Sequence, residues 1–134
     1  MKFSAISTCM IFVITLALEL KRLGNAAFQN KNFKEAEDFY SEAIRLNMGS
    51  RPLWTNRAKC RSTMKKYDEA ISDFESALSI DPKHTESIIL KGNAFLSLGR
   101  FQEAEACYES LRSLGEATLA DANLKKLHDI QEQV

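Results

Sequence analysis

The chain has few of the residues that interrupt helices. It contains only five glycines and two prolines among 134 residues, and long stretches contain neither. A β-sandwich or another many-turned sheet fold needs frequent turn residues, so this composition argues against such folds. The hydrophobic share of 45% is enough to fill a core and excludes a disordered chain. The sequence therefore predicts a single all-α domain.

Charge, cysteine and histidine content exclude further classes. Eighteen basic and eighteen acidic residues give a net charge of zero, unlike the basic chains that bind nucleic acid through its phosphates. Three cysteines without paired spacing indicate neither a disulfide framework nor a zinc site. His84 and His128 are far apart, without a cysteine or carboxylate at metal-ligand spacing, and no phosphate loop or nucleophile motif is present. We expect no enzymatic activity, no metal and no cofactor.

A period of 34 residues organises most of the sequence. Small, aromatic and aliphatic residues recur with this period through three copies without an insertion. The small residues fall where two antiparallel helices must approach closely, and the aromatic residues fill the space between one helix pair and the next. The repeated positions are Gly24, Ala58 and Gly92; Phe33, Tyr67 and Phe101; Ala36, Ala70 and Ala104; Tyr40, Phe74 and Tyr108; Leu46, Ile80 and Leu114.

Each copy contains two runs of apolar residues at helical spacing, which are 17–30 and 34–47 in the first copy. In period and pattern the chain resembles the tetratricopeptide repeat (TPR) family, whose units are helix–turn–helix modules. The resemblance covers three units, and it implies a right-handed α-solenoid of three helix pairs plus a C-terminal capping helix. The units are 17–50, 51–84 and 85–118.

After the third unit the pattern changes to a single amphipathic helix. Thr118 is expected to cap its start, and the apolar residues of 119–134 fall on one stripe. A stack of repeats leaves an apolar face at its end, so we expect this helix to cover that face.

The N-terminal segment 1–18 has no charge after Lys2. One basic residue, an apolar run and the small residue Ala17 resemble a secretory signal peptide. As a membrane span the run is short, because 16 residues rise about 24 Å as a helix against roughly 30 Å of hydrocarbon. Three interpretations stay open: an extra helix against the first repeat, a signal peptide, or a membrane anchor. We expect a cytoplasmic protein, with secretion or membrane anchoring as the alternative.

Charge is sorted between the two helices of each unit. The three first helices together carry seven basic and two acidic residues, whereas the three second helices carry three basic and twelve acidic residues. First helices line the concave side of such a stack. We therefore expect a basic groove that attracts an acidic peptide, although Arg57 and Lys91 occupy a position that packs between helices.

Three residues indicate what the groove binds. Lys21 and Asn25 are four residues apart and share one helix face, and Asn56 lies on the next first helix. An ammonium group with two amide groups suits a carboxylate. This arrangement resembles the carboxylate clamp of TPR co-chaperones, which hold the acidic C-terminal tail of Hsp90 or Hsp70. In that family a lysine and an arginine of the third repeat complete the clamp, but here Glu86 and Leu90 stand in their places.

This departure predicts a mixed ligand. Glu86 is expected to repel a ligand carboxylate, while Leu90, with Ile89 and Leu96, suits an apolar side chain. Lys59 and Asn93 are expected to flank the ligand. We expect a non-enzymatic adaptor of the co-chaperone type that binds an acidic or C-terminal peptide. The alternative is a structural scaffold that docks through its outer face or its apolar N-terminus, with a vestigial groove.

Overall fold

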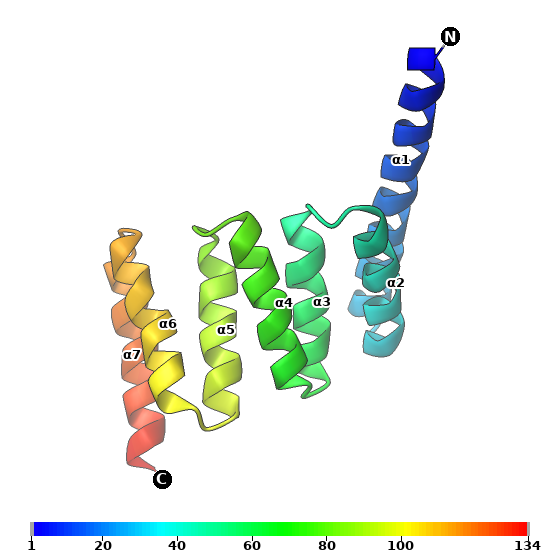
Figure 1. The fold of residues 1–134 in the computed structure, drawn as a ribbon. Coiled ribbons are helices and arrows are strands. Elements are labelled where there is room, and N and C mark those ends of the chain that lie inside the picture. The colour runs from blue at the N-terminus through cyan, green and yellow to red at the C-terminus, as the bar shows by residue number, and fades with distance from the viewer. Residues whose placement is uncertain (1, 134) are drawn as a thin grey trace.

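The all-α prediction is confirmed. A computed structural model of the chain describes the backbone of residues 2–133 and the side chains of residues 7–133. Over the described backbone the chain forms seven helices and no strand, arranged side by side with alternating direction (Figure 1). They are α1 (Lys2–Gln29), α2 (Phe33–Leu46), α3 (Arg51–Thr63), α4 (Tyr67–Ile80), α5 (Thr85–Ser97), α6 (Phe101–Ser113) and α7 (Ala117–Glu132).

Each helix packs mainly on its neighbours in sequence. The pairs α1–α2, α3–α4 and α5–α6 form the three units, and α7 packs on α6 at the end of the array. This order of contacts is that of a repeat stack, in which each unit buries its apolar face against the next. The predicted stack of three helix pairs with a terminal helix is therefore confirmed.

The turns inside the units recur with the 34-residue period. Lys31, Lys65 and Gly99 follow the first helix of each unit, 34 residues apart, and all three have a φ between 62° and 73°. This left-handed conformation costs little only for glycine. The predicted start of the last helix is wrong: α7 begins at Ala117 after Glu116, with no side-chain cap.

The small and aromatic positions form the core between the helices. Ala36, Ala70 and Ala104 are completely buried. Gly24 leaves room for the Tyr40 ring, because a Cβ atom at Gly24 would lie 2.6 Å from Tyr40 Cε1. The 34-residue pattern of small and aromatic residues thus reflects the close approach of each helix pair.

A buried charge network joins α2, α3 and α4. Arg57 binds Asp73 through two hydrogen bonds of 2.8 and 2.9 Å. Arg61 donates to Glu37 at 2.8 Å and to Asp73 at 3.0 Å. Both carboxylates are buried, with exposed fractions of 4% for Glu37 and 2% for Asp73. Two of the basic residues expected to make the groove basic are therefore neutralised between helices, as expected for Arg57 but not for Arg61.

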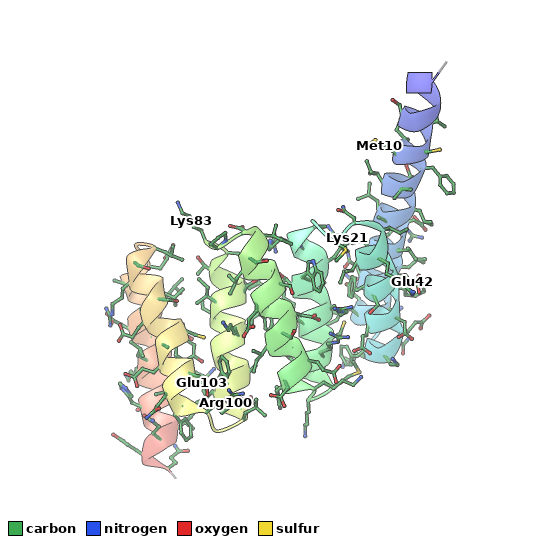
Figure 2. All side chains as sticks on the ribbon, in the orientation of Figure 1. Met10, Lys21, Glu42, Lys83, Arg100 and Glu103 are labelled. Carbon is green, nitrogen blue, oxygen red and sulfur yellow. The ribbon has the colours of Figure 1, made fainter. Side chains whose placement is uncertain are left out.

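The N-terminal part of α1 extends beyond the stack (Figure 1). From Met10 to Leu16 its large apolar side chains are exposed, including Ile11 at 64% and Phe12 at 68% (Figure 2 labels Met10 on this part). Within the described part of the chain, no helix has the length and apolar content required to cross a membrane.

Candidate functional site

Two adjoining recesses lie between the first helices of the units. One, of about 210 Å³, is formed by α1, α2 and α3, and we call it the polar recess. The other, of about 310 Å³, reaches from α1 across α3 and α4 to α5, and we call it the apolar recess. Phe28 and Lys59 line both, so the two recesses are neighbours. Together they form the groove of this molecule.

The polar recess brings together nitrogen-bearing side chains from two helices. α1 contributes Asn25 and Gln29, and α3 contributes Asn56 and Lys59. Amide and ammonium groups donate hydrogen bonds, and a group of such donors suits a carboxylate. Three residues predicted from the sequence therefore line one recess, which is completed by Phe28 and Tyr40.

Tyr40 holds Asn25 in a defined orientation. The Tyr40 hydroxyl donates to Asn25 Oδ1 at 2.5 Å. Because the amide oxygen of Asn25 accepts this bond, the side chain offers a ligand the N–H donors of its Nδ2 amide nitrogen. The close approach of α2 that allows the bond depends on Gly24, which leaves space for the Tyr40 ring.

The apolar recess contains one ion pair at its rim. Phe28, Phe74 and Leu90 provide the apolar lining, and Lys59 forms a salt bridge with Glu86. The hydrogen bond from Lys59 lowers the pKa of Glu86, so this carboxylate is ionised at neutral pH. Glu86 was expected to face a ligand as a free negative charge, but Lys59 pairs with it.

The remaining predicted residues lie outside both recesses. Lys21 is on α1 one turn before Asn25, on the part of the helix that packs in the stack (Figure 2). Asn93 on α5 accepts a hydrogen bond from Tyr108 at 2.5 Å, repeating the bond between Asn25 and Tyr40. Ile89, Leu90 and Leu96 all pack against the core, and of these three predicted apolar residues Leu90 also lines the apolar recess.

Part of the groove lining was not predicted from the sequence. Phe28 and Gln29 follow Asn25 by three and four residues, and this spacing places all three on one helix face. Tyr40 and Phe74 were assigned only to the core, although each also borders a recess. A repeated aromatic position thus serves both packing and the groove.

The described side chains offer little to catalysis. They contain no group of three His, Cys, Asp or Glu residues that could hold a metal ion. Burial raises the pKa of the Cys60 thiol to about 12 and also raises that of Cys107, so neither is a ready nucleophile. His84 precedes α5 and accepts a hydrogen bond from the Ser87 backbone N–H, which is a capping role.

The chain matches models of the tetratricopeptide repeat family over residues 17–47 and 61–127. Small glutamine-rich tetratricopeptide repeat-containing protein 2 of Saccharomyces cerevisiae is 37% identical over 95 residues, which make up 71% of this chain and 28% of that protein. The chain spans less than a third of the length of the curated relatives that it matches.

Solved TPR domains share the fold over nearly their whole length. The Arabidopsis OM64 TPR domain has a TM-score of 0.80 and 30% identity, covering 87% of this chain and 98% of that domain. The first TPR of Spaghetti (RPAP3), bound to the HSP90 peptide SRMEEVD, has a TM-score of 0.79 and 28% identity. The match covers 88% of this chain and 94% of that domain. The chain therefore belongs to the tetratricopeptide repeat family.

Proposed function

We propose that this chain is a non-enzymatic adaptor that binds the free C-terminus of an acidic peptide in its groove. Asn25, Asn56 and Lys59 hold the terminal carboxylate in the polar recess, and Lys21 supplies a further positive charge from the turn of α1 above it. The partner class is the C-terminal tail of an Hsp70 or Hsp90 chaperone. The proposed location is the cytoplasm.

One observation carries this proposal. Nitrogen donors from α1 and α3 converge on a single recess of about 210 Å³, and one of them, Asn25, is oriented by Tyr40. A donor that is already oriented loses less entropy when it binds a ligand than a free side chain does. A carboxylate with two oxygens matches such a group of donors better than a neutral amide does.

Similar proteins support the choice of partner. The RPAP3 domain was solved with an HSP90 peptide that ends in Val-Asp, and another relative in the comparison is named as an Hsp70/Hsp90 co-chaperone. For the location, the alternative to the cytoplasm is a secreted or membrane-anchored form through residues 1–18.

The test is a titration of the full chain with fluorescein-labelled SRMEEVD as free acid and as C-terminal amide. Charge-assisted hydrogen bonds to the terminal carboxylate predict that amidation weakens binding by at least about tenfold. Asn56→Ala should weaken binding of the free acid about tenfold, because it removes one such donor. Asn123→Ala on α7, whose side chain bonds the Leu119 carbonyl, is the matched control and should bind normally. Absence of binding to either peptide form would contradict the proposal.

A second candidate, a structural scaffold, is favoured by the exposed apolar residues of α1. Ile11 and Phe12 are each more than 60% exposed, and residues 3–18 of this helix contain no charged residue. A scaffold that docks through this segment predicts that Ile11→Glu with Phe12→Glu shifts the tagged chain from high-mass to low-mass fractions of a cell extract. Asn56→Ala should leave that distribution unchanged. The adaptor proposal predicts that the double variant still binds SRMEEVD.

A further inference from the structure

We infer that the groove prefers an acidic tail whose last residue is apolar. A tail that ends in aspartate, such as the HSP90 peptide, then binds but less tightly than the same tail with an apolar last residue. This inference rests on the proposed function, because it assumes that the polar recess holds the terminal carboxylate. It concerns the neighbouring apolar recess, which no part of that proposal uses.

The two recesses are close enough to receive one residue. Both are lined by Phe28 and Lys59, so a residue with its carboxylate among the nitrogen donors has its side chain at the entrance of the apolar recess. Phe28, Phe74 and Leu90 line that recess, with Ser62 and Thr63 of α3 beside Lys59. Its volume of about 310 Å³ leaves space for a branched aliphatic or aromatic side chain.

Charge around the apolar recess disfavours an acidic side chain there. The Lys59 ammonium at its rim already pairs with Glu86, and Leu90 carries no donor. An aspartate side chain would meet the Glu86 carboxylate, and the one basic residue among those that line the recess, Lys59, is already paired with Glu86. Placing a charge against an apolar surface without a partner is costly, whereas an apolar side chain gains by leaving water.

Lys59 couples the two recesses. Lys59 lines the polar recess, where a ligand carboxylate would attract its ammonium group. At the apolar recess the same ammonium group forms a salt bridge with Glu86. A ligand carboxylate and Glu86 therefore compete for one ammonium group. Removal of the Glu86 charge should free Lys59 for the ligand, so Glu86→Gln is expected to strengthen binding of any peptide with a free terminus.

The experiment compares two labelled peptides, SRMEEVD and SRMEEVL, each as free acid and as amide, on the full chain. The last side chain of SRMEEVL is a leucine that gains free energy on burial, whereas the aspartate of SRMEEVD would be desolvated without a cation to pair with. SRMEEVL is therefore expected to bind about tenfold more tightly than SRMEEVD. Glu86→Lys with Leu90→Arg places two cations at the apolar recess and should reverse the preference. Leu90→Gln, which is similar in size but polar, should reduce it. Circular dichroism checks that each variant is folded.

The results of these titrations test the preference for an apolar last residue separately from the proposed function. A preference for SRMEEVL that the double variant reverses supports the inference. If both free acids bind, amidation weakens both, and SRMEEVD binds as tightly as SRMEEVL or more tightly, the inference is wrong and the proposed function stands. If neither free acid binds, the proposed function fails and the inference fails with it. Should the double variant not fold, Leu90→Gln and Glu86→Gln decide the question in its place.

Discussion

The hydroxyl of Tyr40 on α2 donates a hydrogen bond to Oδ1 of Asn25 on α1. The same bond joins Tyr108 to Asn93 two units later. The middle unit has Phe74 and Lys59 at these positions and lacks the bond. A buried hydroxyl needs an acceptor and a phenyl ring does not, so the aromatic residue and its neighbour on the first helix change together. In the middle unit the exchange places the Lys59 ammonium in the groove.

Tyr40→Phe is predicted to weaken peptide binding about threefold, because Asn25 loses the donor that orients it and must be ordered by the ligand. The stability of the fold should fall by about 1 kcal/mol, the net value of a typical hydrogen bond. Fluorescence titration measures the first effect and urea unfolding the second.

Tyr108→Phe is the matched control for this prediction. It removes an equivalent bond, to Asn93, which lies outside both recesses. The loss of stability should be similar and the affinity for the peptide unchanged. Equal losses of affinity in the two variants would show that the effect of Tyr40→Phe arises from general loosening of the stack.

Gly24→Ala is predicted to destabilise the chain. The added Cβ would lie 2.6 Å from Tyr40 Cε1, so the ring or α2 must move. Overpacking of this kind costs about 1–3 kcal/mol. Gly49→Ala is the control, because the added Cβ would meet only the Asn47 side chain, at 3.9 Å. This variant should change the free energy of unfolding by less than about 0.5 kcal/mol. Thermal and urea unfolding of both variants test the comparison.

Substitutions in the turns within the units are predicted to change the free energy of unfolding in opposite directions. Gly99→Ala forces a side chain into the left-handed region and should cost about 1–2 kcal/mol, although nothing obstructs its Cβ. Lys65→Gly should raise stability by up to about 1 kcal/mol, because Lys65 adopts a φ of 64° at the equivalent position. Destabilisation by Lys65→Gly in urea unfolding would contradict the assignment of strain to this turn.

The buried charge network predicts a loss of stability in acid. Burial alone would raise the pKa of Glu37, but hydrogen bonds from Arg61 and Lys34 and the charge of Lys66 outweigh it and lower the pKa to about 2. Because the folded pKa lies below the unfolded value, this stabilisation is present above about pH 4.5 and disappears as the pH falls toward 2. The contribution is on the order of 3 kcal/mol.

Glu37→Gln tests this pH dependence. The variant cannot ionise at position 37, so the slope of its unfolding free energy against pH between 4.5 and 2 should be shallower than that of the parent. Glu42→Gln, on the same helix, removes a carboxylate that pairs only with Arg45 at the surface and is the control. Parallel slopes for Glu37→Gln and the parent would show that another carboxylate carries the acid sensitivity.

The architecture was predictable because its contacts are local. The positions of Ala36 and Tyr40 recur every 34 residues, and each helix packs mainly on its neighbours in sequence. A period in the sequence then corresponds directly to a period in space. Thr118 shows the limit of this approach, since a capping residue was predicted from its type alone and the helix begins one residue earlier.

The groove was predictable only in part. The spacing of Lys21 and Asn25 and the resemblance to the carboxylate clamp indicated Asn25 and Asn56, and both line the polar recess, whereas Lys21 does not. The pairing of Lys59 with Glu86 could not be predicted, because it depends on how far two flexible side chains from different units extend toward each other. The same reason explains why Arg61 was counted as a groove cation.

The amino-acid sequence by itself determined the helices, their pairing and the order of the units, since side-chain size at repeated positions sets how closely adjacent helices pack. The tertiary structure decided which charges remain available to a ligand. Arg61 is enclosed with Glu37 and Asp73, and Lys59 is shared between Glu86 and the polar recess. Which ion pairs form depends on the distances between side chains from different helices, and these distances are set only when the units have stacked.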